Sequence, residues 1–503
     1  MAHANARDYR IHYPAVMPPE MPETPETPET PEMAAAATSP LIHSLLADLG
    51  VEAGGVDLAI APADEMLGFL VRSQGGDRER ALYAYFQSGA SIAAAMAQVL
   101  RWRFGDPRRT GRLLDFASGY GRVTRFLLRL LPAERIWVSD VYAGGVDFQR
   151  RRFGVHGLVS TVRPEDFPAA AGPGTFDAIL VTSLFTHLPE ERFVAWLRML
   201  LGLLSPGGVL AFSVHGEHVL PAGAELPASG LLFQEVSESG SLAGTDYGST
   251  WVSEEFVRGA LARALAGGST GAGAGAASAA AGAASAGAGS SAGSLLRLPR
   301  GLCNYQDLYV AVPEAGADFS GLDFRGEPYL FVERCVLAGP DRLELGGWAG
   351  VLGRGSLAAV EALLDGRLLA RMPIDGARPE VAEMLGEPRL LRSGWGGACR
   401  LPEDASRTAS VLSLRVIDDL GAAHPEAAAT LEAALHDSTR LEVTVLQREL
   451  HLARQRAEGQ RLEAEALRAR IAAMEASRFW KLRNQWFRVK GWFGAGKGRA
   501  APR

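Results

Sequence analysis

The feature that most constrains this chain is a turn of small residues directly after a short apolar strand. Residues 113–121 read Leu-Leu-Asp-Phe-Ala-Ser-Gly-Tyr-Gly, so an acidic residue at the end of the strand is followed by Ala117, Gly119 and Gly121 at alternate positions. Small residues let the backbone approach a ligand closely, and open α/β sheets bind nucleotides in the crevice beyond their strand ends. The turn therefore predicts a parallel sheet with a nucleotide-type ligand.

Short apolar strands alternate with helices around this turn. Strands are predicted at residues 112–116, 135–139, 176–182 and 209–214, and helices at residues 123–131 and 190–204. This order of elements implies right-handed crossovers and a mostly parallel sheet. We therefore expect an α/β, Rossmann-like, doubly wound domain over residues 111–313, closed by an antiparallel pair at residues 295–298 and 305–312.

A second acidic residue, Asp140, ends the strand that follows, 25 residues after Asp115. Its carboxylate is placed to accept hydrogen bonds from ribose hydroxyls, because neighbouring parallel strands end at the same edge of the sheet. The turn and Asp140 together therefore indicate a nucleoside site.

With these residues the chain resembles the class I S-adenosylmethionine-dependent methyltransferases. Their first motif is commonly D/E-x-G-x-G-x-G, and this chain has Asp115-x-Ala117-x-Gly119-x-Gly121, with alanine in place of the first glycine. Later landmarks of the family follow in order at residues 138–140, 176–180 and 204–208. The resemblance covers roughly residues 80–313 and implies methyl transfer from S-adenosylmethionine.

The resemblance also implies which residues hold the cofactor. The backbone from Asp115 to Gly121 would hold the methionine part, and Asp140 the ribose. Asp166 is the candidate for the contact to the adenine amino group. Tyr85 either closes over the cofactor or packs in the core, where aromatic residues at helical spacing usually lie. The expected cofactor-binding residues are Asp115, Phe116, Ala117, Ser118, Gly119, Gly121, Asp140, Val141, Asp166 and Tyr85, and no metal is expected.

A dehydrogenase that binds NAD is the rival interpretation of the glycine-rich turn. Its motif is G-x-G-x-x-G, because a pyrophosphate must sit on the N-terminus of the helix. Here Gly121 is followed by Arg122, Val123 and Thr124, with no third glycine. S-adenosylmethionine has no phosphate, so the pattern favours the methyltransferase.

Two histidines follow predicted strand ends and are the candidate catalytic residues, His187 and His215. Methyl transfer needs a general base only when the acceptor, such as a hydroxyl, must lose a proton. His187 precedes Pro189 and Glu190, which look like a first helical turn, so fixing that turn is its alternative role. The alternative for His215 is a loop histidine without a function.

Residues 320–423 have a pattern of short apolar segments separated by turns, which predicts a small β-sandwich. Strands are expected at residues 343–348, 360–364, 367–372 and 411–417, with Asp365-Gly366 as a hairpin turn. Trp348 and Trp395 are core anchors in the simplest interpretation, or stack on carbohydrate if exposed. The region resembles accessory β domains of bacterial surface-polysaccharide enzymes, which implies a sugar hydroxyl of a cell-surface glycan precursor as the acceptor.

The remaining segments have distinct compositions. Residues 1–40, with a Pro-Glu-Thr repeat, predict a disordered leader, residues 41–110 a helical cap, and residues 267–294 a Gly/Ala/Ser insertion. From Glu426 the chain is expected to be helical, with a heptad seam that predicts a coiled coil over 426–477 and a homo-oligomer; one long helix packed on its own domain is the alternative.

Residues 478–503 form a basic, aromatic tail. No acidic residue follows Glu475, and Phe479, Leu482, Trp486, Val489 and Phe493 make one apolar helical face. Such a helix suits peripheral contact with an anionic membrane surface. Packing against the coiled coil, plain solubility and RNA binding are the alternatives.

Charge and cysteines narrow the class of protein further. The formal net charge of −6 argues against nucleic acid as a partner of the whole chain. Cys303, Cys335 and Cys399 form no CxxC pair, which excludes a zinc ribbon and fits a reducing cytoplasm. We expect a cytoplasmic enzyme, held at the inner membrane face by its tail. The rival hypothesis is a methyltransferase-like scaffold without activity, assembled by the coiled coil, which the alanine at position 117 keeps open.

Overall fold

The computed structural model describes residues 36–436, except 53, 168–171, 222, 236–241, 243 and 267–292. The leader up to residue 35, most of the insertion, the heptad seam and the basic tail lie outside the described residues. Among the described residues, no helix is long and apolar enough to span a membrane.

Among the described residues, the helices α2 (Pro40–Asp48), α3 (Glu65–Ser73) and α4 (Arg78–Phe104) precede the first sheet. Each begins where a side chain accepts a backbone N–H of the first turn, from Ser39, Asp64 and Asp77 respectively. Residues 36–38 are already helical, so ordered structure begins before the predicted end of the leader at residue 40.

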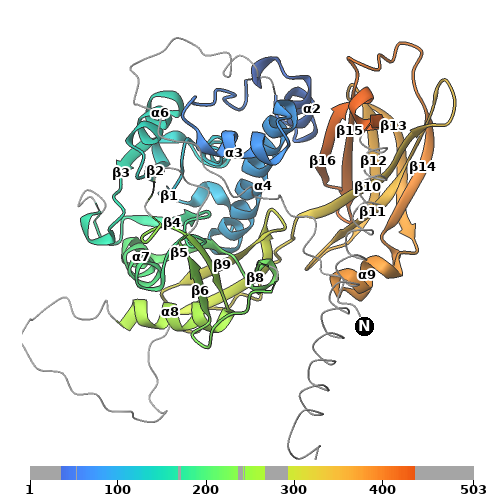
Figure 1. The fold of residues 1–503 in the computed structure, drawn as a ribbon. Coiled ribbons are helices and arrows are strands. Elements are labelled where there is room, and N and C mark those ends of the chain that lie inside the picture. The colour runs from blue at the N-terminus through green and yellow to red at the C-terminus, as the bar shows by residue number, and fades with distance from the viewer. Residues whose placement is uncertain are drawn as a thin grey trace, which may run out of the picture. The chain divides into compact units, whose positions relative to one another are not determined.

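The central sheet has the strand order β3-β2-β1-β4-β5-β9-β8 (Figure 1). The five neighbouring strands β3, β2, β1, β4 and β5 pair in parallel, whereas β9 is antiparallel to both β5 and β8. The predicted α/β sheet with its closing antiparallel pair is therefore confirmed. The strands are β1 (Leu113–Phe116), β2 (Ile136–Asp140), β3 (His156–Val159), β4 (Phe176–Val181), β5 (Leu204–Val214), β8 (Ser294–Leu302) and β9 (Gln306–Val312).

Two hydrophobic cores lie on opposite faces of this sheet, because alternate residues of its strands point to opposite sides. Leu113 belongs to the core that contains Val99 of α4, and Leu114 to the core that contains Leu197. Burial on both faces explains why the strands are continuously apolar. The helices of the domain after β1 are α5 (Thr124–Leu127), α6 (Ala143–Phe153), α7 (Glu190–Leu203) and α8 (Glu254–Ala266).

Three features differ from the sequence expectation in this domain. Helix α5 is shorter than the predicted 123–131, and residues 128–130 form turns. Strand β3 and helix α6 were not predicted. A two-stranded sheet, β6 (Leu231–Gln234) with β7 (Ser249–Val252), was also not predicted, and Trp251 in β7 forms a parallel bridge with His215, just after β5.

Residues 328–430 form a second, antiparallel sheet of order β10-β11-β14-β13-β12-β15-β16. It is one continuous sheet rather than two, since β13 pairs with β12 and with β14. Its core combines residues of distant strands, such as Leu343 and Leu414. The elements are β10 (Pro328–Leu337), β11 (Arg342–Val351), β12 (Leu357–Leu364), β13 (Arg367–Gly376), α9 (Pro379–Leu385), β14 (Gly394–Arg400), β15 (Val411–Asp418) and β16 (Ala423–Thr430).

Other local predictions about the β domain have mixed outcomes. Asp365 and Gly366 have φ of 49° and 76°, as a two-residue hairpin turn with two left-handed positions requires. Glu426 lies in strand β16 and not in a helix; helical structure begins at Leu431. Trp348 and Trp395 are 3% and 6% exposed, which makes them core residues and rules out stacking of their rings on a sugar.

Candidate cofactor and acceptor site

The carboxylate of Asp140 is hydrogen-bonded to the glycine-rich turn. The register pairs Phe116 with Ser139, so the strand ends of β1 and β2 are adjacent. The N–H of Gly119 donates to Asp140 Oδ2 at 2.7 Å, and the N–H of Tyr142 donates to Oδ1 at 3.0 Å. Burial raises the pKa of Asp140, while backbone hydrogen bonds, one of them from Val141, oppose that rise. The structure thus brings the turn and the second acidic strand end together.

Asp115 lies beneath the turn and is 1% exposed. The Thr124 hydroxyl is 2.7 Å from Asp115 Oδ2 and also 2.7 Å from Gln149 Oε1. Gln149 donates its amide N–H groups to Ser118 Oγ and to the Gly119 carbonyl, which fixes Oε1 as the atom that faces Thr124. One hydroxyl proton cannot serve two acceptors, so both contacts form only if Asp115 supplies a proton.

The pKa of Asp115 agrees with this hydrogen-bond count. Burial raises it from 3.8 to about 7, and the neighbouring charge of Asp140 adds to the rise. A raised carboxyl pKa means that the folded state retains a proton which the unfolded chain loses. Its contribution to stability is therefore complete below pH 4 and is lost as the pH rises to about 7.

We expect Asp115→Asn to flatten part of this pH dependence. An asparagine N–H donates to Thr124 as the protonated acid does, but it does not ionise. Urea denaturation of the ligand-free protein between pH 4 and pH 8 should show wild-type stability falling with pH more steeply than that of the variant. The difference between the two curves isolates Asp115 from other buried acids such as Glu327. Parallel curves would contradict a protonated Asp115.

The turn itself uses left-handed backbone conformations. Ala117, Gly119 and Gly121 have φ of 58°, 56° and 82°. A Cβ on Gly121 would lie 2.4 Å from the ring of Phe153, so this position requires glycine. The methyl group of Ala117 strains the turn, because a left-handed alanine costs roughly 1 kcal/mol.

The effect of a substitution at position 117 on the free energy of unfolding should therefore depend on the backbone strain of the new residue. Ala117→Gly removes the strain but adds chain entropy, and we expect the free energy of unfolding to stay within about 0.5 kcal/mol of wild type or to rise. Ala117→Val places a β-branched residue at positive φ and should destabilise by roughly 1–3 kcal/mol. Urea denaturation measures both. Equal losses for glycine and valine would contradict the assignment of strain to this residue.

Tyr85 occupies the core beside the turn. It is fully buried, and its hydroxyl donates to Asp64 Oδ2 at 2.6 Å. The Arg125 guanidinium lies 5.4 Å from the Tyr85 ring centroid, and Arg125 Nε donates to the Gly121 carbonyl at 3.1 Å. Of the two expected roles, the structure gives Tyr85 core packing, in which it supports the turn through Arg125. Asp64 and Arg125 were not predicted.

Asp166 lies apart from this cluster. It ends the short helix Pro164–Asp166 and is exposed, and none of its described hydrogen bonds reaches the turn. The next residue, Phe167, packs against Phe116 with ring centroids 5.7 Å apart. The adenine contact of Asp166 therefore stays a prediction, without support from the described geometry.

His187 is held in one orientation by the backbone of a distant loop. Its Nδ1 is 2.6 Å from the carbonyl oxygen of Gly248, and its ring stacks on Tyr247 with centroids 4.5 Å apart. A carbonyl oxygen only accepts, so Nδ1 carries the hydrogen and Nε2 carries the lone pair of the neutral ring. The hydrogen bond and the stack therefore fix the orientation of the imidazole ring.

His215 belongs to the same group of rings. Its ring centroid lies 6.3 Å from that of His187, 5.3 Å from Tyr305 and 6.1 Å from Trp251. We call His187, His215, Tyr247, Trp251 and Tyr305 the aromatic cluster. Its three members other than the histidines come from loops and a short strand without periodicity, so no sequence pattern could have assigned them to a site.

The two histidines of the aromatic cluster follow β4 and β5, which end at the same edge of the sheet as β1 and its turn. Val181 pairs with Phe116, so Ser183 follows its strand level with the turn. Ser183 has a φ of 61°, and its N–H donates to Ser213 Oγ at 2.8 Å. Its hydroxyl is 2.9 Å from Gln306 Nε2, which ties the end of β4 to β9. Strained residues at two adjacent strand ends are typical of functional sites.

The local geometry fits a cationic nucleoside. A Cβ on Gly119 would meet no protein atom within 4 Å, so space lies open beside the residue whose N–H donates to Asp140. Thr182 Oγ1, at the end of β4, is buried and has no hydrogen-bond partner in the described part of the chain. Asp140 would hold the ribose, and the turn would hold the methionine part. The described residues contain no group of three or more side chains suited to a metal ion.

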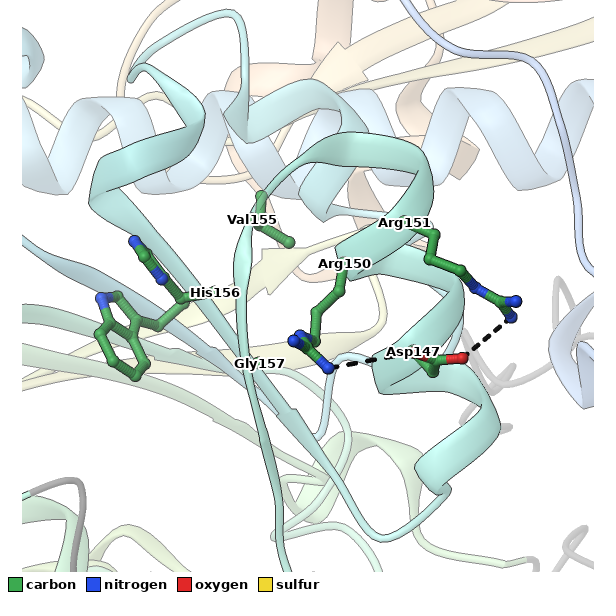
Figure 2. A pocket seen from close by; sticks show the side chains of 7 residues that line it. Asp147, Arg150, Arg151, Val155, His156 and Gly157 are labelled. Carbon is green, nitrogen blue, oxygen red and sulfur yellow. Dashed lines mark ion pairs between the residues drawn. The ribbon is translucent and has the colours of Figure 1, made fainter.

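A separate hollow of about 380 Å³ lies at the starts of β2 and β3, away from these strand ends (Figure 2). Trp137 and His156 stack there with centroids 4.6 Å apart. Arg150 and Arg151 point toward Asp147, and their side chains are 58% and 65% exposed. This is a solvated surface and not part of the cofactor site.

Part of the chain is similar to known methyltransferases. Residues 114–210 match the model of a methyltransferase domain. The malonyl-[acyl-carrier protein] O-methyltransferase of Prosthecochloris aestuarii (strain DSM 271 / SK 413) is 29% identical over 147 residues. That alignment covers 29% of this chain and 54% of the relative, so the chain spans about half the length of the curated relative it matches.

Solved structures with similarity to this chain include a protein of Streptomyces venezuelae and a methyltransferase of Burkholderia thailandensis. Streptomyces venezuelae DesVI is 15% identical, with 45% of this chain and 92% of that chain covered and a TM-score of 0.31. Burkholderia thailandensis 1,6-didemethyltoxoflavin-N1-methyltransferase, solved with S-adenosylhomocysteine, is 16% identical, with 50% and 91% covered and a TM-score of 0.28. Residues 114–210 of this chain thus match a methyltransferase domain.

Proposed function

We propose that this protein transfers the methyl group of S-adenosylmethionine to a hydroxyl of a sugar in a cell-surface glycan precursor. The observation that carries the proposal is the 2.7 Å hydrogen bond from the Gly119 N–H to Asp140, which joins the two acidic strand ends in one site. Beside them, the aromatic cluster provides a place for the acceptor.

The histidines favour a hydroxyl acceptor. The cofactor supplies an electrophilic methyl carbon on a positively charged sulfur, so a nucleophile needs only alignment and the loss of its proton. When an acceptor hydroxyl displaces the sulfur at that carbon, its proton would pass to the imidazole of His187. The stack on Tyr247 and the bond to Gly248 hold the imidazole for this role. His215, 6.3 Å away ring to ring, lines the acceptor side.

Two further observations support a sugar. The rings of Tyr247 and Tyr305, which are only partly buried, offer apolar faces together with polar edges, which suit the two sides of a sugar ring. The β domain resembles accessory β domains of bacterial surface-polysaccharide enzymes. The residue pattern at 477–483, in the tail, resembles tails of bacterial glycosyltransferases. The coiled coil and the contact of the tail with the inner membrane face belong to the same proposal and rest on residues outside the described part. A cytoplasmic location also belongs to it and rests on the cysteines, which form no CxxC pair.

A carboxylate acceptor is the competing possibility, because the name of the Prosthecochloris relative specifies O-methylation of malonyl-[acyl-carrier protein]. A carboxylate is already ionised near pH 7 and needs no base. The oriented, buried His187 favours the hydroxyl over this alternative. A non-catalytic scaffold would bind no cofactor, and the open space at Gly119 favours the enzyme.

A labelled-methyl assay tests the proposal. The full chain is incubated with methyl-labelled S-adenosylmethionine and either glycan fractions of the source cell or malonyl-[acyl-carrier protein]. We expect label in the saccharide fraction that survives mild alkali, because ethers resist hydrolysis and methyl esters do not. Alkali-labile label, or label only in the carrier protein, would show that the acceptor is a carboxylate and not a sugar hydroxyl. Cofactor binding without transfer to either acceptor would contradict both.

A further inference from the structure

A polar groove of about 450 Å³ crosses β10, β11 and β14 of the β domain. This volume is in the range of small-ligand sites. Its floor is backbone and small residues, and its walls are charged side chains. The groove is lined by Glu333, Arg334, Arg342, Glu344, Leu345, Gly346, Gly347, Arg378, Trp395, Gly396, Gly397 and Ala398, and we call it the β-domain groove.

Glycines make the floor of the groove flat, and packing does not require all of them. Gly346 pairs with Gly396 across the strands. Gly347 must be glycine, since a Cβ there would lie 1.9 Å from the Phe331 carbonyl oxygen, but a Cβ on Gly346 would meet nothing closer than 3.5 Å. Glycine inside a strand weakens it and often marks close approach of a ligand. Below the floor, the buried indole N–H of Trp395 has no acceptor among the described residues.

A β-bulge brings two successive side chains to the groove. The register of β10 shifts between Val332 and Arg334, so Glu333 and Arg334 both line the groove, although neighbours in a regular strand point to opposite faces. Bulges commonly re-aim side chains next to binding sites. Gly347 makes room for this bulge.

The walls consist of paired charges with hydrogen-bonding capacity left over. Arg378 donates through both terminal nitrogens to Glu333 and also to the Gly347 carbonyl at 3.1 Å. Arg334 pairs with Glu344. Each carboxylate has about four lone-pair sites and each guanidinium five N–H donors, so these pairs still accept from and donate to a ligand.

From this arrangement we infer that the β-domain groove binds a neutral, hydroxyl-rich saccharide. A sugar hydroxyl both donates and accepts, which matches carboxylates and guanidinium groups that alternate along the walls. A phosphate ligand would have to lie against Glu333 and Glu344, and an apolar ligand would leave the walls unpaired. The sugar lies on the flat glycine floor, since the ring of Trp395 is buried. The inference does not rest on methyl transfer.

Saturation-transfer NMR with the full chain, without cofactor, tests the inference. The probes are neutral cello-, chito- and manno-oligosaccharides at millimolar concentration, with inorganic phosphate as the competitor. We expect transfer to at least one saccharide and no competition by phosphate. Ala398→Trp and Gly346→Val fill the groove at positions with room for them and should weaken binding at least about tenfold, or about 1.4 kcal/mol.

Leu368→Trp is the matched control, because Leu368 is 51% exposed on β13 and does not line the groove. It should bind as wild type does. Absence of transfer to every saccharide, unchanged binding in both filled variants, or displacement by phosphate would each overturn the inference. Methyl transfer is not measured, so these outcomes are separate from failure of the proposed function.

Discussion

Replacing Asp140 with alanine will weaken S-adenosylmethionine binding by at least about 100-fold. Hydrogen bonds to a charged group contribute about 1.5–3 kcal/mol each, so losing two ribose contacts costs about 3–6 kcal/mol. The substitution also removes the acceptor for the Gly119 N–H, which positions the turn. Isothermal titration calorimetry of the full chain measures the dissociation constant directly.

Asp147→Ala is the matched control for this experiment. Asp147 lies on α6, its side chain is 49% exposed, and it pairs with Arg151 at 2.9 Å on the surface. Its loss should leave cofactor affinity unchanged. Circular dichroism of both variants establishes that they are folded. Equal affinity of folded Asp140→Ala and wild type would contradict the assigned role of the second strand end.

Replacing His187 with alanine will lower kcat by about 10²- to 10⁴-fold, the usual contribution of a general base. The cofactor dissociation constant should change little, because the bonds of His187 are to the Gly248 loop and not to the turn. Steady-state assays with the acceptor that the labelled-methyl assay identifies measure kcat and KM across pH. The limb of the pH profile that reports the base should vanish in the variant.

His187→Asn separates catalysis from a merely structural role. An asparagine N–H can donate to the Gly248 carbonyl as Nδ1 does, which keeps the loop in place but removes the basic nitrogen. We expect this variant to fold and to remain as inactive as alanine. His156→Ala, in the exposed stack on Trp137, is the control and should retain activity. Recovery of activity by asparagine would assign His187 to the structure of the loop alone.

The sequence predicts the central strands well because they are buried on both faces. Leu113, Ile179 and Val209 are each fully buried, so their segments are continuously apolar and easily recognised. Strand β3 has only four residues and lies at the sheet edge, with His156 and Val159 exposed. Such a strand carries little hydrophobic pattern, which is why it was missed.

The end of the β domain shows how a local signal can be overridden. Pro425-Glu426 before a run of alanines resembles the first turn of a helix. Strand β16 is at the sheet edge, where a proline without an N–H is tolerated, and Leu414 and Val416 of β15 provide the partner strand. Tertiary pairing therefore decided this segment against its helical propensity.

The candidate site was predictable only where it follows strand ends in sequence. Asp115 and Asp140 lie at the ends of β1 and β2, and His187 and His215 follow β4 and β5, so the sheet brings all four to one edge. Tyr247, Trp251 and Tyr305 reach the same place from β7 and from two loops, and their positions depend on long-range pairing such as the His215–Trp251 bridge. Single-sequence patterns carry no information about such contacts.

A crystal structure of the full chain with S-adenosylhomocysteine tests the central claim most directly. Our account predicts both ribose hydroxyls within hydrogen-bond distance of the Asp140 carboxylate, with the amino-acid part of the ligand lying along residues 115–121. A ligand bound elsewhere, or an Asp140 whose oxygens contact only the backbone of its own loop and turn while the ligand lies apart, would contradict it.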